Sequence, residues 1–460
     1  MNLEDTIVAP ATPGGVGAIH VIRISGPKAV WIADRVFDGA DLATVDTHTV
    51  HYGFIRDSAE TIDEVMVSIF RAPRSFTTED VIEISCHGSP YITSRIVQLL
   101  VDRGARPAEA GEFTFRAFLH GRLDLSQAEA VADLISSDSR KSRDLALDQM
   151  RGGISDELKR LRGDLVDFAA LVELELDFSE EDVEFADRDA LIGKATEVRS
   201  VIARLRDSFR LGNVFKHGVQ LAIVGRPNAG KSSWINALSD DDVAIVSEIA
   251  GTTRDKVESS ISIGGLRFNL IDTAGLRESE DTIERIGVER AVHALEHADM
   301  IVHIFDVTET DRHEFLREYE WVLDRNPEAM RIVVGNKIDA IPASDEEVRQ
   351  AFGYDVNLFF LSAHRRADVD VLKSAMERIV LEREETPGDA VVSNARHVAA
   401  LDKAHDALGE VVAGIRSGQS GDLVAFNLRY AIRYLGEITG EVDIDRDILG
   451  TIFGKFCIGK

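Results

Sequence analysis

Residues 225–232 read Gly-Arg-Pro-Asn-Ala-Gly-Lys-Ser and directly follow the apolar run 221–224. The spacing G-x-x-x-x-G-K-S predicts a strand that leads through a phosphate-binding loop into a helix. The two glycines of this pattern allow a tight backbone whose N–H groups point at phosphate oxygens, and the helix adds its positive end. Lys231 then reaches the outer phosphates, and Ser232 can bind Mg²⁺. The alternative, an ordinary glycine-rich turn, is disfavoured by the flanking strand and helix.

A second motif identifies the base. Residues 336–339 read Asn-Lys-Ile-Asp, after the apolar run 331–335. The carboxylate of Asp339 can accept hydrogen bonds from both N1–H and the exocyclic amine of guanine, a donor pair that adenine lacks. The pattern N-K-x-D is weak alone, but at about 105 residues beyond the phosphate loop it is a strong indication of a GTP site.

Further elements complete this site. Asn336 and Lys337 would brace the base loop, and the backbone of 362–364 (Ser-Ala-His) would close the base pocket. Residues 272–275 (Asp-Thr-Ala-Gly) end another apolar strand, where Asp272 would hold the metal through water and the N–H of Gly275 would contact the γ-phosphate.

The stretch 251–255 (Gly-Thr-Thr-Arg-Asp) is a short polar loop. A threonine there binds Mg²⁺ only when the γ-phosphate is present, which makes the loop a switch. The alternative for Thr252 and Thr253 is a simple turn.

The group that positions the attacking water is not obvious. Many GTPases use a glutamine just after the D-x-x-G stretch, but Leu276 stands there. Glu280, Asp281 and Glu284 are the carboxylates of the next segment, and each can equally be a solvated surface residue. Asn228 in the phosphate loop can ligand a monovalent cation through its amide oxygen, or can simply be a turn residue.

Composition sets outer limits. The chain has 460 residues, enough for about three domains, and a net charge of −28. This charge disfavours a protein dominated by broad nucleic-acid contacts, because such contacts need Lys and Arg against phosphate. Two cysteines exclude a disulfide framework or a multi-Cys zinc site and fit a reduced cytoplasm. We expect no signal peptide and no membrane span.

Periodicity predicts a multidomain α/β plus α protein. An α+β domain, residues 1–120, has strands at 6–9, 17–24, 65–70 and 81–85 and a helix at 91–103. A helical part follows at 121–215, in which Ile154, Leu158, Leu161, Leu165, Phe168 and Val172 form one apolar stripe. We expect helices before Gly152-Gly153 and at 190–210, then a linker at 212–218. The GTP-binding domain spans 216–382, ends in a helix at 369–382, and is followed by a linker at 386–388 and a second helical part at 383–460. The GTP domain is thus inserted into a helical domain made from both sides of it.

The N-terminal domain carries features with two interpretations each. The glycine-rich loop 12–17 and the adjacent Arg23, which we expect to be buried, suggest a small-molecule site, although a hairpin loop looks the same. Glu83 within a β run is costly if it points inward without a partner and routine if it points outward. For Cys86 and His87 we prefer a packed thiol and a turn to metal or nucleophile chemistry. Cys457 near the chain end can be carried into a site by a mobile tail, or the tail can simply pack through its phenylalanines.

Together these pieces resemble the tRNA modification GTPase family MnmE, also called TrmE, over nearly the full length. Beyond the GTP motifs, the resemblance rests on short stretches across the chain. They are 5–9 (Asp-Thr-Ile-Val-Ala), 23–27 (Arg-Ile-Ser-Gly-Pro), 111–114 (Gly-Glu-Phe-Thr), 116–118 (Arg-Ala-Phe), 123–130 (Leu-Asp-Leu-Ser-Gln-Ala-Glu-Ala) and 456–460 (Phe-Cys-Ile-Gly-Lys).

The resemblance implies a role for individual residues. Arg23, Glu83, Arg122 and Lys460 resemble folate-site residues, although the family usually has Lys where Arg122 stands. Asn228, Ser247, Ile249 and Thr252 resemble potassium ligands, and Ser232 and Thr253 resemble magnesium ligands. The expected catalytic residues are Glu284, which matches the family's water-positioning glutamate, Lys231 and Cys457. The full set expected at GTP is Asn228, Ala229, Gly230, Lys231, Ser232, Ser233, Ser247, Glu248, Ile249, Ala250, Gly251, Thr252, Thr253, Asp272, Thr273, Ala274, Gly275, Asn336, Lys337, Asp339, Ser362, Ala363 and His364.

The resemblance also implies a biochemical role. The N-terminal domain would dimerise and bind 5-formyl-tetrahydrofolate or a related one-carbon folate, and the GTP domain would dimerise across its active site in a K⁺-dependent way, with Mg²⁺ at GTP. A heterotetramer with the flavin- and NADH-dependent protein MnmG (GidA) would add a carboxymethylaminomethyl-type group to C5 of the wobble uridine, position 34, of certain tRNAs, with tRNA bound largely through the complex. We expect a cytoplasmic homodimer without stable membrane insertion.

Two other functions remain open on sequence. The first is a GTP-controlled assembly switch for ribosomes or membranes without a modification role, which the folate-like domain and the tail cysteine disfavour. The second is a self-contained folate-dependent transferase. The sequence does not reveal which tRNAs are used, whether glycine or ammonium is the amine donor, or what Cys457 does.

Overall fold

The structure is a computed structural model of the chain. It describes residues 4–177, 188–239, 260–271, 292–341, 357–382 and 390–442, and in the tail residues 449, 452–454, 456 and 459. The chain folds into two compact units, one of residues 1–132, 149–186 and 418–460, the other of residues 133–148 and 187–417.

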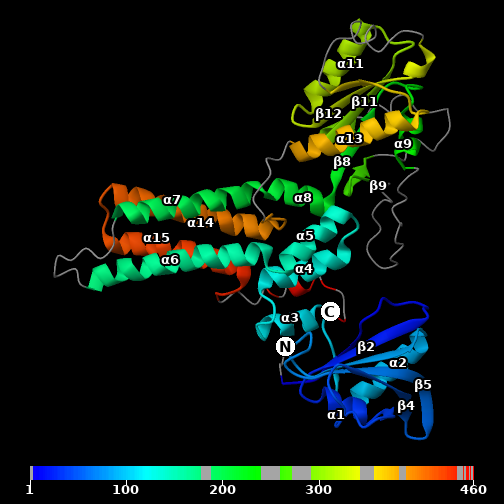
Figure 1. Cartoon of the computed structure of the whole chain (residues 1–460), viewed down its shortest axis with the longest axis vertical. Coiled ribbons are helices and arrows are strands. Elements are labelled where there is room, and N and C mark those ends of the chain that lie inside the picture. Colours follow the sequence, from blue (N-terminus) through cyan, green and yellow to red (C-terminus); the bar gives the residue numbers. More distant parts are fainter. Residues whose placement is uncertain are drawn as a thin grey trace. The chain divides into compact units, whose positions relative to one another are not determined.

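The N-terminal region is built on a mainly antiparallel sheet with the strand order β3-β4-β5-β6-β2-β1-β7 (Figure 1). Its strands are β1 (Ile7–Pro10), β2 (Ile19–Ser25), β3 (Phe37–Asp38), β4 (Thr49–Asp57), β5 (Glu60–Phe70), β6 (Val81–His87) and β7 (Arg106–Pro107). Its helices are α1 (Ala29–Asp34), α2 (Pro90–Asp102) and α3 (Glu112–Leu119). The strands and the helix predicted here are therefore confirmed, with bounds that move by a few residues. The prediction missed β3, β4, β7, α1 and α3. Among them, β4 alternates partly buried with exposed side chains over its first half.

The two faces of this sheet are covered differently. On one face, apolar side chains such as Ile22, Ile24, Ile82 and Ile84 pack with buried residues of α1 and α2. On the opposite face, a smaller cluster of Ile7, Ala9, Ala108 and Phe113, with Phe76 at its edge, covers only the part of the sheet near β1. Since strand side chains alternate between faces, the odd-numbered residues of β2 and β6 line this second, partly open face.

The region predicted to bind nucleotide (residues 216–382, called the nucleotide-binding region below) has a mostly parallel sheet in the order β13-β12-β11-β8-β10-β9. Among the described strands of this sheet, only β9 runs antiparallel to its neighbour. Its strands are β8 (Val219–Val224), β9 (Ser260–Ile263), β10 (Leu266–Leu270), β11 (Met300–Asp306), β12 (Met330–Asn336) and β13 (Leu358–Phe360). Its helices are α9 (Lys231–Ser239), α11 (Arg312–Arg325), the short η3 (Ile338–Ala340) and α13 (Arg366–Glu382).

Both faces of this sheet are buried, as a parallel sheet requires. Trp234 of α9 and Leu372 of α13 join the apolar cluster on one face, and Val322 of α11 belongs to the cluster on the other. β8, β11 and β12 run parallel, so their carboxyl ends meet at one edge of the sheet, where ligands bind in open α/β folds.

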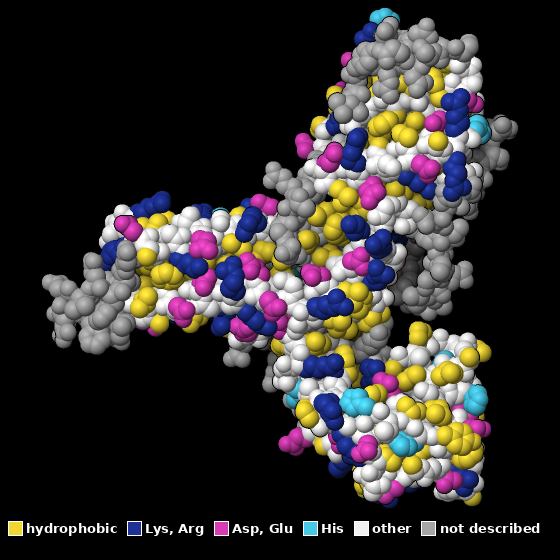
Figure 2. Space-filling view, in the orientation of Figure 1, with side chains coloured by type: hydrophobic (Ala, Val, Ile, Leu, Met, Phe, Trp, Pro, Cys, Tyr) yellow, Lys and Arg dark blue, Asp and Glu magenta, His cyan; other side chains and the backbone are white. Residues whose placement is uncertain are grey.

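Long helices form two packed pairs, α6 with α15 and α7 with α14 (Figure 1). Their bounds are α6 (Gly153–Asp177), α7 (Arg188–Asp207), α14 (Ala395–Arg416) and α15 (Gly421–Thr439), and the shorter α4 (Leu125–Ser136) and α5 (Arg140–Met150) precede them. The predicted stripe of α6 is buried at five of its six positions, and Phe168 is half-buried. The visible outer face of these helices carries interspersed acidic and basic side chains (Figure 2).

Residues 212–218 were predicted to link the helical part to the nucleotide-binding region, and in the structure this link is helical. The helix predicted at 190–210 ends at Asp207, and a second helix, α8 (Phe209–His217), continues to the start of β8. Gly212 lies inside α8. Glycine is needed there because a Cβ would stand 2.0 Å from the carbonyl oxygen of Val392. The glycine therefore permits a close crossing of two segments and does not break the helix. In addition, Ser208 Oγ accepts a 3.0 Å hydrogen bond from Val392 N.

This crossing yields a test with a matched control. Gly212→Ala should destabilise the protein by about 1–3 kcal/mol, because the new methyl group must displace backbone. Gly163→Ala, in the exposed part of α6 where a Cβ meets nothing within 4 Å, should stabilise it by roughly 0.5–1 kcal/mol through helix propensity alone. Denaturant titration followed by circular dichroism measures both. A stabilising Gly212→Ala would contradict the crossing.

Candidate functional site

The phosphate loop joins β8 to α9 at the edge where the parallel strands end. Gly225 has φ +147°, and a Cβ there would lie 2.0 Å from the carbonyl oxygen of Ile304 on the neighbouring strand β11. Asn228, near the middle of the loop, is left-handed at φ +66°. The loop therefore presses against the sheet, and only glycine fits its first position.

Lys231 begins α9 and reaches back across this loop. Its Nζ donates 2.7 Å hydrogen bonds to the carbonyl oxygens of Gly225 and Arg226. Burial lowers the pKa of this ammonium group. A partly buried cation over a loop of backbone N–H groups favours an anion such as a polyphosphate. Ser232 and Ser233 lie exposed in the first turn of the helix, where a hydroxyl can serve a cation bound to phosphate.

Asn336, the last residue of β12, ties the base loop to the phosphate loop. Its buried amide donates a 2.8 Å hydrogen bond to the carbonyl oxygen of Ala229 and accepts one of 3.0 Å from the indole N–H of Trp234. A Cβ on Gly230, whose φ is +101°, would lie 2.1 Å from the Asn336 amide nitrogen. The second glycine of the phosphate motif is thus required by a side chain of the base motif.

The base loop is held from both sides. Lys337 is left-handed at φ +66°, and its Nζ lies 2.5 Å from Asp306 Oδ2. Burial opposes ionisation of Asp306, but the hydrogen bond from Lys337 lowers its pKa overall. Asp339 is exposed, and a hydrogen bond from the buried Ser362 hydroxyl lowers the pKa of its carboxyl group. Asp339 is therefore an ionised acceptor, as recognition of a guanine edge requires.

Residues 362–364 complete this wall of the site. The Ala363 N–H lies 3.4 Å from Asn336 Oδ1, and the His364 N–H donates to Ser362 Oγ at 3.3 Å. The Ser362 N–H donates a 2.8 Å hydrogen bond to Asp368 at the start of α13. The phosphate loop, the base loop and this segment therefore meet, although they lie far apart in sequence.

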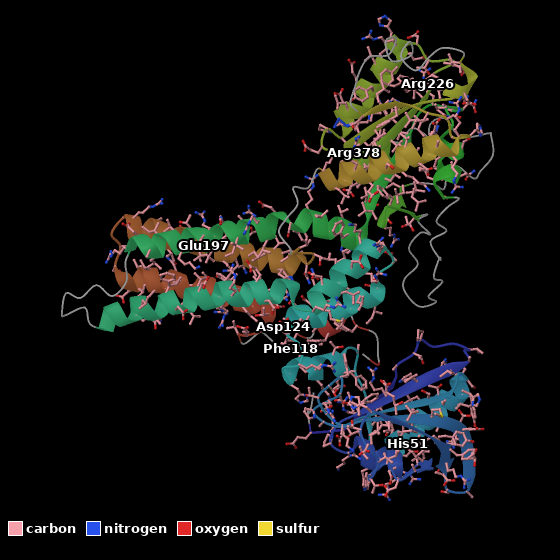
Figure 3. The ribbon with its side chains drawn as sticks, in the orientation of Figure 1. His51, Phe118, Asp124, Glu197, Arg226 and Arg378 are labelled. Carbon is pink, nitrogen blue, oxygen red and sulfur yellow. The ribbon has the colours of Figure 1, made fainter. Side chains whose placement is uncertain are left out.

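Sequence reasoning missed two residues that support this site. Arg226, at the second position of the phosphate motif, pairs with both Glu314 and Glu318 of α11; its side chain is labelled in Figure 3. Trp234 is fully buried and orients Asn336. Arg226 is a variable position of the motif and Trp234 lies two residues beyond it, so the pattern carries no signal for either, and the partners of both come from distant segments.

Many predicted residues lie outside the described part of the chain, and their roles stay predictions. They are Ser247, Glu248, Ile249, Ala250, Gly251, Thr252, Thr253, Asp272, Thr273, Ala274, Gly275, Glu284, Cys457 and Lys460.

A second group of predicted residues meets on the partly open face of the N-terminal sheet. Arg23 pairs with Ala9 on one side and with Glu83 on the other in the strand register. The guanidinium of Arg23 and the carboxylate of Glu83 form an ion pair, with Nη2 2.7 Å from Oε1. The two side chains are 19% and 27% exposed, so Arg23 is half-buried, and Glu83 is neither an unpartnered core acid nor a freely solvated one.

Arg122, just after α3, reaches the same part of this face, which is called the N-terminal corner below. It donates a hydrogen bond to the carbonyl oxygen of Ser75. The tail also arrives there, because Arg23 Nη1 lies 3.5 Å from the carbonyl oxygen of Gly459. Phe453 and Phe456 are buried against Leu125 and Ala128 of α4. The packed alternative therefore holds for these phenylalanines.

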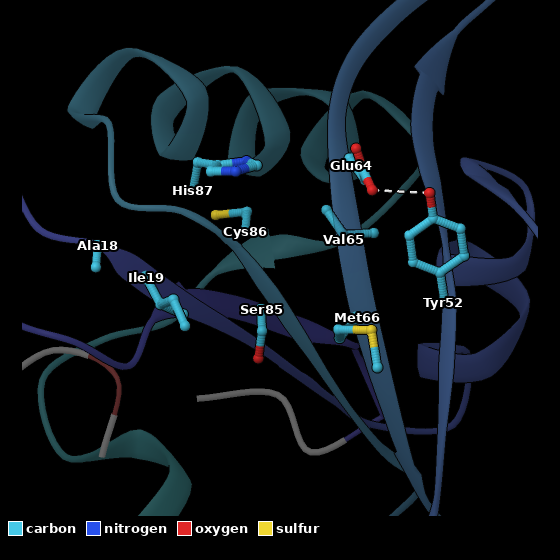
Figure 4. Close-up of a pocket in the computed structure, with 9 residues that line it drawn as sticks. All are labelled: Ala18, Ile19, Tyr52, Glu64, Val65, Met66, Ser85, Cys86 and His87. Carbon is cyan, nitrogen blue, oxygen red and sulfur yellow. Dashed lines mark hydrogen bonds between the residues drawn. The ribbon is translucent and has the colours of Figure 1, made fainter.

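Next along the same face is a shallow hollow of about 310 Å³. Figure 4 shows Tyr52, Glu64 and Met66 on one side of it, with Tyr52 donating a 2.7 Å hydrogen bond to Glu64. Cys86 lines it but is only 2% exposed, and burial raises the pKa of its thiol. The preference for a packed Cys86 is confirmed; His87, however, ends β6 and pairs with Asp63 at 2.7 Å.

Two other kinds of feature are absent from the residues that the structure describes. Within that part of the chain, no cluster of three or more His, Cys, Asp or Glu side chains is arranged to hold a metal ion. None of the helices traced there has the length and apolar character needed to cross a bilayer.

Known proteins match this chain along nearly its whole length. The family model described as MnmE helical domain matches residues 125–457, and the one described as GTP-binding protein TrmE N-terminus matches residues 6–122. A tRNA modification GTPase MnmE of Cytophaga hutchinsonii is 50% identical over 459 residues, covering 100% of this chain and 98% of the relative. Those of Christiangramia forsetii and Flavobacterium johnsoniae are 46% and 47% identical, covering 100% and 99% of this chain and 100% and 99% of the relatives.

The exposed Asp339 carboxylate gives the most direct test of base choice. Asp339→Asn should weaken GTP binding by at least about tenfold and should strengthen binding of xanthosine triphosphate, because the amide can donate to the 2-oxo group. Fluorescence titration with both nucleotides measures the change. Asp370→Asn, which alters an exposed carboxylate further along α13, is the control. Unchanged selectivity in Asp339→Asn would remove this carboxylate from guanine recognition.

Proposed function

The chain belongs to the MnmE family of tRNA modification GTPases, and on that premise we propose that its GTP hydrolysis serves the modification of tRNA at the wobble uridine. With a flavin-dependent partner protein, it would add a carboxymethylaminomethyl-type group to C5 of uridine 34 in certain tRNAs. The GTP-hydrolysing role is supported most directly by the hydrogen bonds of the Asn336 side chain, which join the base loop to the phosphate loop.

The hydrolytic step uses residues of these loops. Lys231 and the loop N–H groups hold the outer phosphates, and Asp339 holds the guanine edge. Mg²⁺ would be bound by Ser232 and Thr253 and would neutralise developing charge on the phosphate oxygens. Glu284 would position the attacking water in place of the glutamine that Leu276 replaces.

K⁺ would be bound by Asn228, Ser247, Ile249 and Thr252, and it would supply the positive charge that an arginine finger gives in other GTPases. Dimerisation of the GTP domains across this site would complete it.

We propose an N-terminal domain (1–120), a first helical part (121–215), a GTP domain (216–382) and a second helical part (383–460). The GTP domain is inserted into a helical domain made of the two helical parts. Two facts support it. The helices pair across the insertion, α6 with α15 and α7 with α14. The chain also enters and leaves the nucleotide-binding region at one place, where Val392 crosses Gly212. Movement of the GTP domain can therefore be transmitted through two adjacent segments.

The N-terminal corner would bind 5-formyl-tetrahydrofolate or a related one-carbon folate, with Arg23, Glu83, Arg122 and Lys460 as contacts. An arginine–glutamate pair suits a pterin, which offers neighbouring hydrogen-bond donors and acceptors, and a further cation suits the glutamyl carboxylates. Cys457 would act in the modification step.

The partners proposed are a second copy of the chain and the flavin- and NADH-dependent protein MnmG (GidA), in a heterotetramer located in the cytoplasm. The net charge of −28 supports tRNA binding largely through the complex, because phosphate contacts require a basic surface.

Cation replacement tests the metal assignment. Exchange of K⁺ for Na⁺ at constant ionic strength should slow GTP hydrolysis by at least about tenfold, because the smaller ion fits the same ligands poorly. Asn228→Ala should be slow in both salts while retaining nucleotide affinity. Steady-state phosphate release gives the rates. Equal rates for the parent protein in the two salts would exclude a specific K⁺ site.

Reconstitution tests the function as a whole. The purified chain, the flavoprotein partner, GTP, a reduced nicotinamide, a one-carbon folate and unmodified tRNA should together yield modified uridine 34, detected by nucleoside mass spectrometry. Lys231→Ala should abolish the product, because GTP turnover is lost. Modification by the isolated chain would instead support a self-contained transferase, and unchanged uridine in cells with and without the protein would support an assembly switch.

A further inference from the structure

The ring of Phe76 is the point where two of the candidate folate residues meet. The guanidinium carbon of Arg23 lies 5.5 Å from the ring centroid, and that of Arg122 lies 5.2 Å from it. The three residues come from β2, from the loop between β5 and β6, and from the segment after α3. Both distances are within the range in which a cation is attracted to the face of an aromatic ring.

Phe76 is held in place from several directions. Its ring packs at the edge of the cluster formed by Ile7, Ala9, Ala108 and Phe113. On either side of it in the chain, Ser75 Oγ donates a 2.5 Å hydrogen bond to the carbonyl oxygen of Glu79, and the Thr77 hydroxyl lies 2.6 Å from that of Ser25. The position of the ring is therefore fixed by the fold, independently of any ligand.

The two arginines differ in their charge partners. Arg23 is neutralised by Glu83. Arg122, among the residues that the structure describes, has no carboxylate within ion-pair distance, and its hydrogen bond goes to the Ser75 carbonyl oxygen. Burial lowers the pKa of the Arg122 guanidinium group. Within the described part of this corner, the charge of Arg122 is therefore uncompensated, and an anionic ligand would neutralise it.

We propose that Phe76 is a positioning residue of the folate site, whose ring holds the guanidinium groups of Arg23 and Arg122 together so that Arg122 faces the carboxylate end of the ligand. This inference rests on the proposed folate function. An arginine suits this position, because a planar guanidinium stacks on a ring and keeps its hydrogen-bonding edge free.

The test measures binding of 5-formyl-tetrahydrofolate to the full-length chain by calorimetry. Phe76→Leu keeps the apolar bulk but removes the aromatic face, and it should weaken binding about tenfold, whereas Phe76→Tyr should stay within about twofold of the parent. Phe54→Leu is the matched control. The ring of Phe54 lies in the same sheet and also has an arginine over it, with the guanidinium carbon of Arg56 6.0 Å from the ring centroid. This control should leave folate binding unchanged.

A second background separates positioning from packing. If Phe76 acts through Arg122, then Phe76→Leu should weaken binding much less in an Arg122→Ala protein than in the parent. The same loss in both backgrounds would assign Phe76 to packing alone and overturn the inference. Unchanged binding in Phe76→Leu would overturn it as well. If the parent chain binds no folate under these conditions, the proposed folate site itself fails.

Discussion

The nucleotide-binding region depends on one buried amide. Asn336 accepts from the Trp234 indole and donates to the Ala229 carbonyl oxygen, so a single side chain holds the base motif against the phosphate motif. Leaving either group unpaired in this buried place would cost about 1–3 kcal/mol. Gly230 is constrained by the same contact, since any larger residue would occupy the position of the amide. The base loop and the phosphate loop are therefore one structural unit.

The N-terminal region has its own organising interaction, a network of charges beneath the proposed folate corner. Arg116 is fully buried and forms ion pairs with Asp5, Glu79 and Glu112, while Arg106 pairs with Asp5 and Glu112. Burial works against ionisation of Asp5 and Glu112, but hydrogen bonds from the arginines lower the pKa of both carboxyl groups. Loss of one partner would leave buried charge uncompensated, which is strongly destabilising. The network fixes α3 on the sheet, and α3 in turn carries Phe113 over Arg23 at 5.7 Å.

The features that the sequence predicted well are those that depend on local spacing. The phosphate motif fixes its loop through backbone geometry, so β8, the loop and α9 follow from the pattern alone. The stripe of α6 follows from helical periodicity and the burial of one face. The Asn–Lys–x–Asp pattern predicted the end of β12 and the base loop, because its side chains must be held in one arrangement to contact the edge of a guanine base. In each case the physical requirement acts on residues close together in the chain.

What the sequence did not reveal depends on distant partners. Gly212 suggests a linker, but it lies within a helix. It is glycine because the backbone at Val392, far along the chain, passes too close for a side chain. Arg226 looks like a free loop position, yet it is held by Glu314 and Glu318 of α11. Phe76 reads as an ordinary loop phenylalanine, and its place between two arginines follows only from the meeting of three segments. Such residues are set by tertiary contacts, which a single sequence does not display.

The central claim is that the Asn336 contact joins a guanine-reading loop to a triphosphate-binding loop in one site. Calorimetric titration of the full-length chain with GTP and with ATP, in the presence of Mg²⁺ and K⁺, tests it most directly. We predict that GTP binds at least about a hundredfold more tightly than ATP, because adenine leaves the Asp339 carboxylate without its donors. Equal affinity for the two nucleotides, or no binding of either, would contradict it.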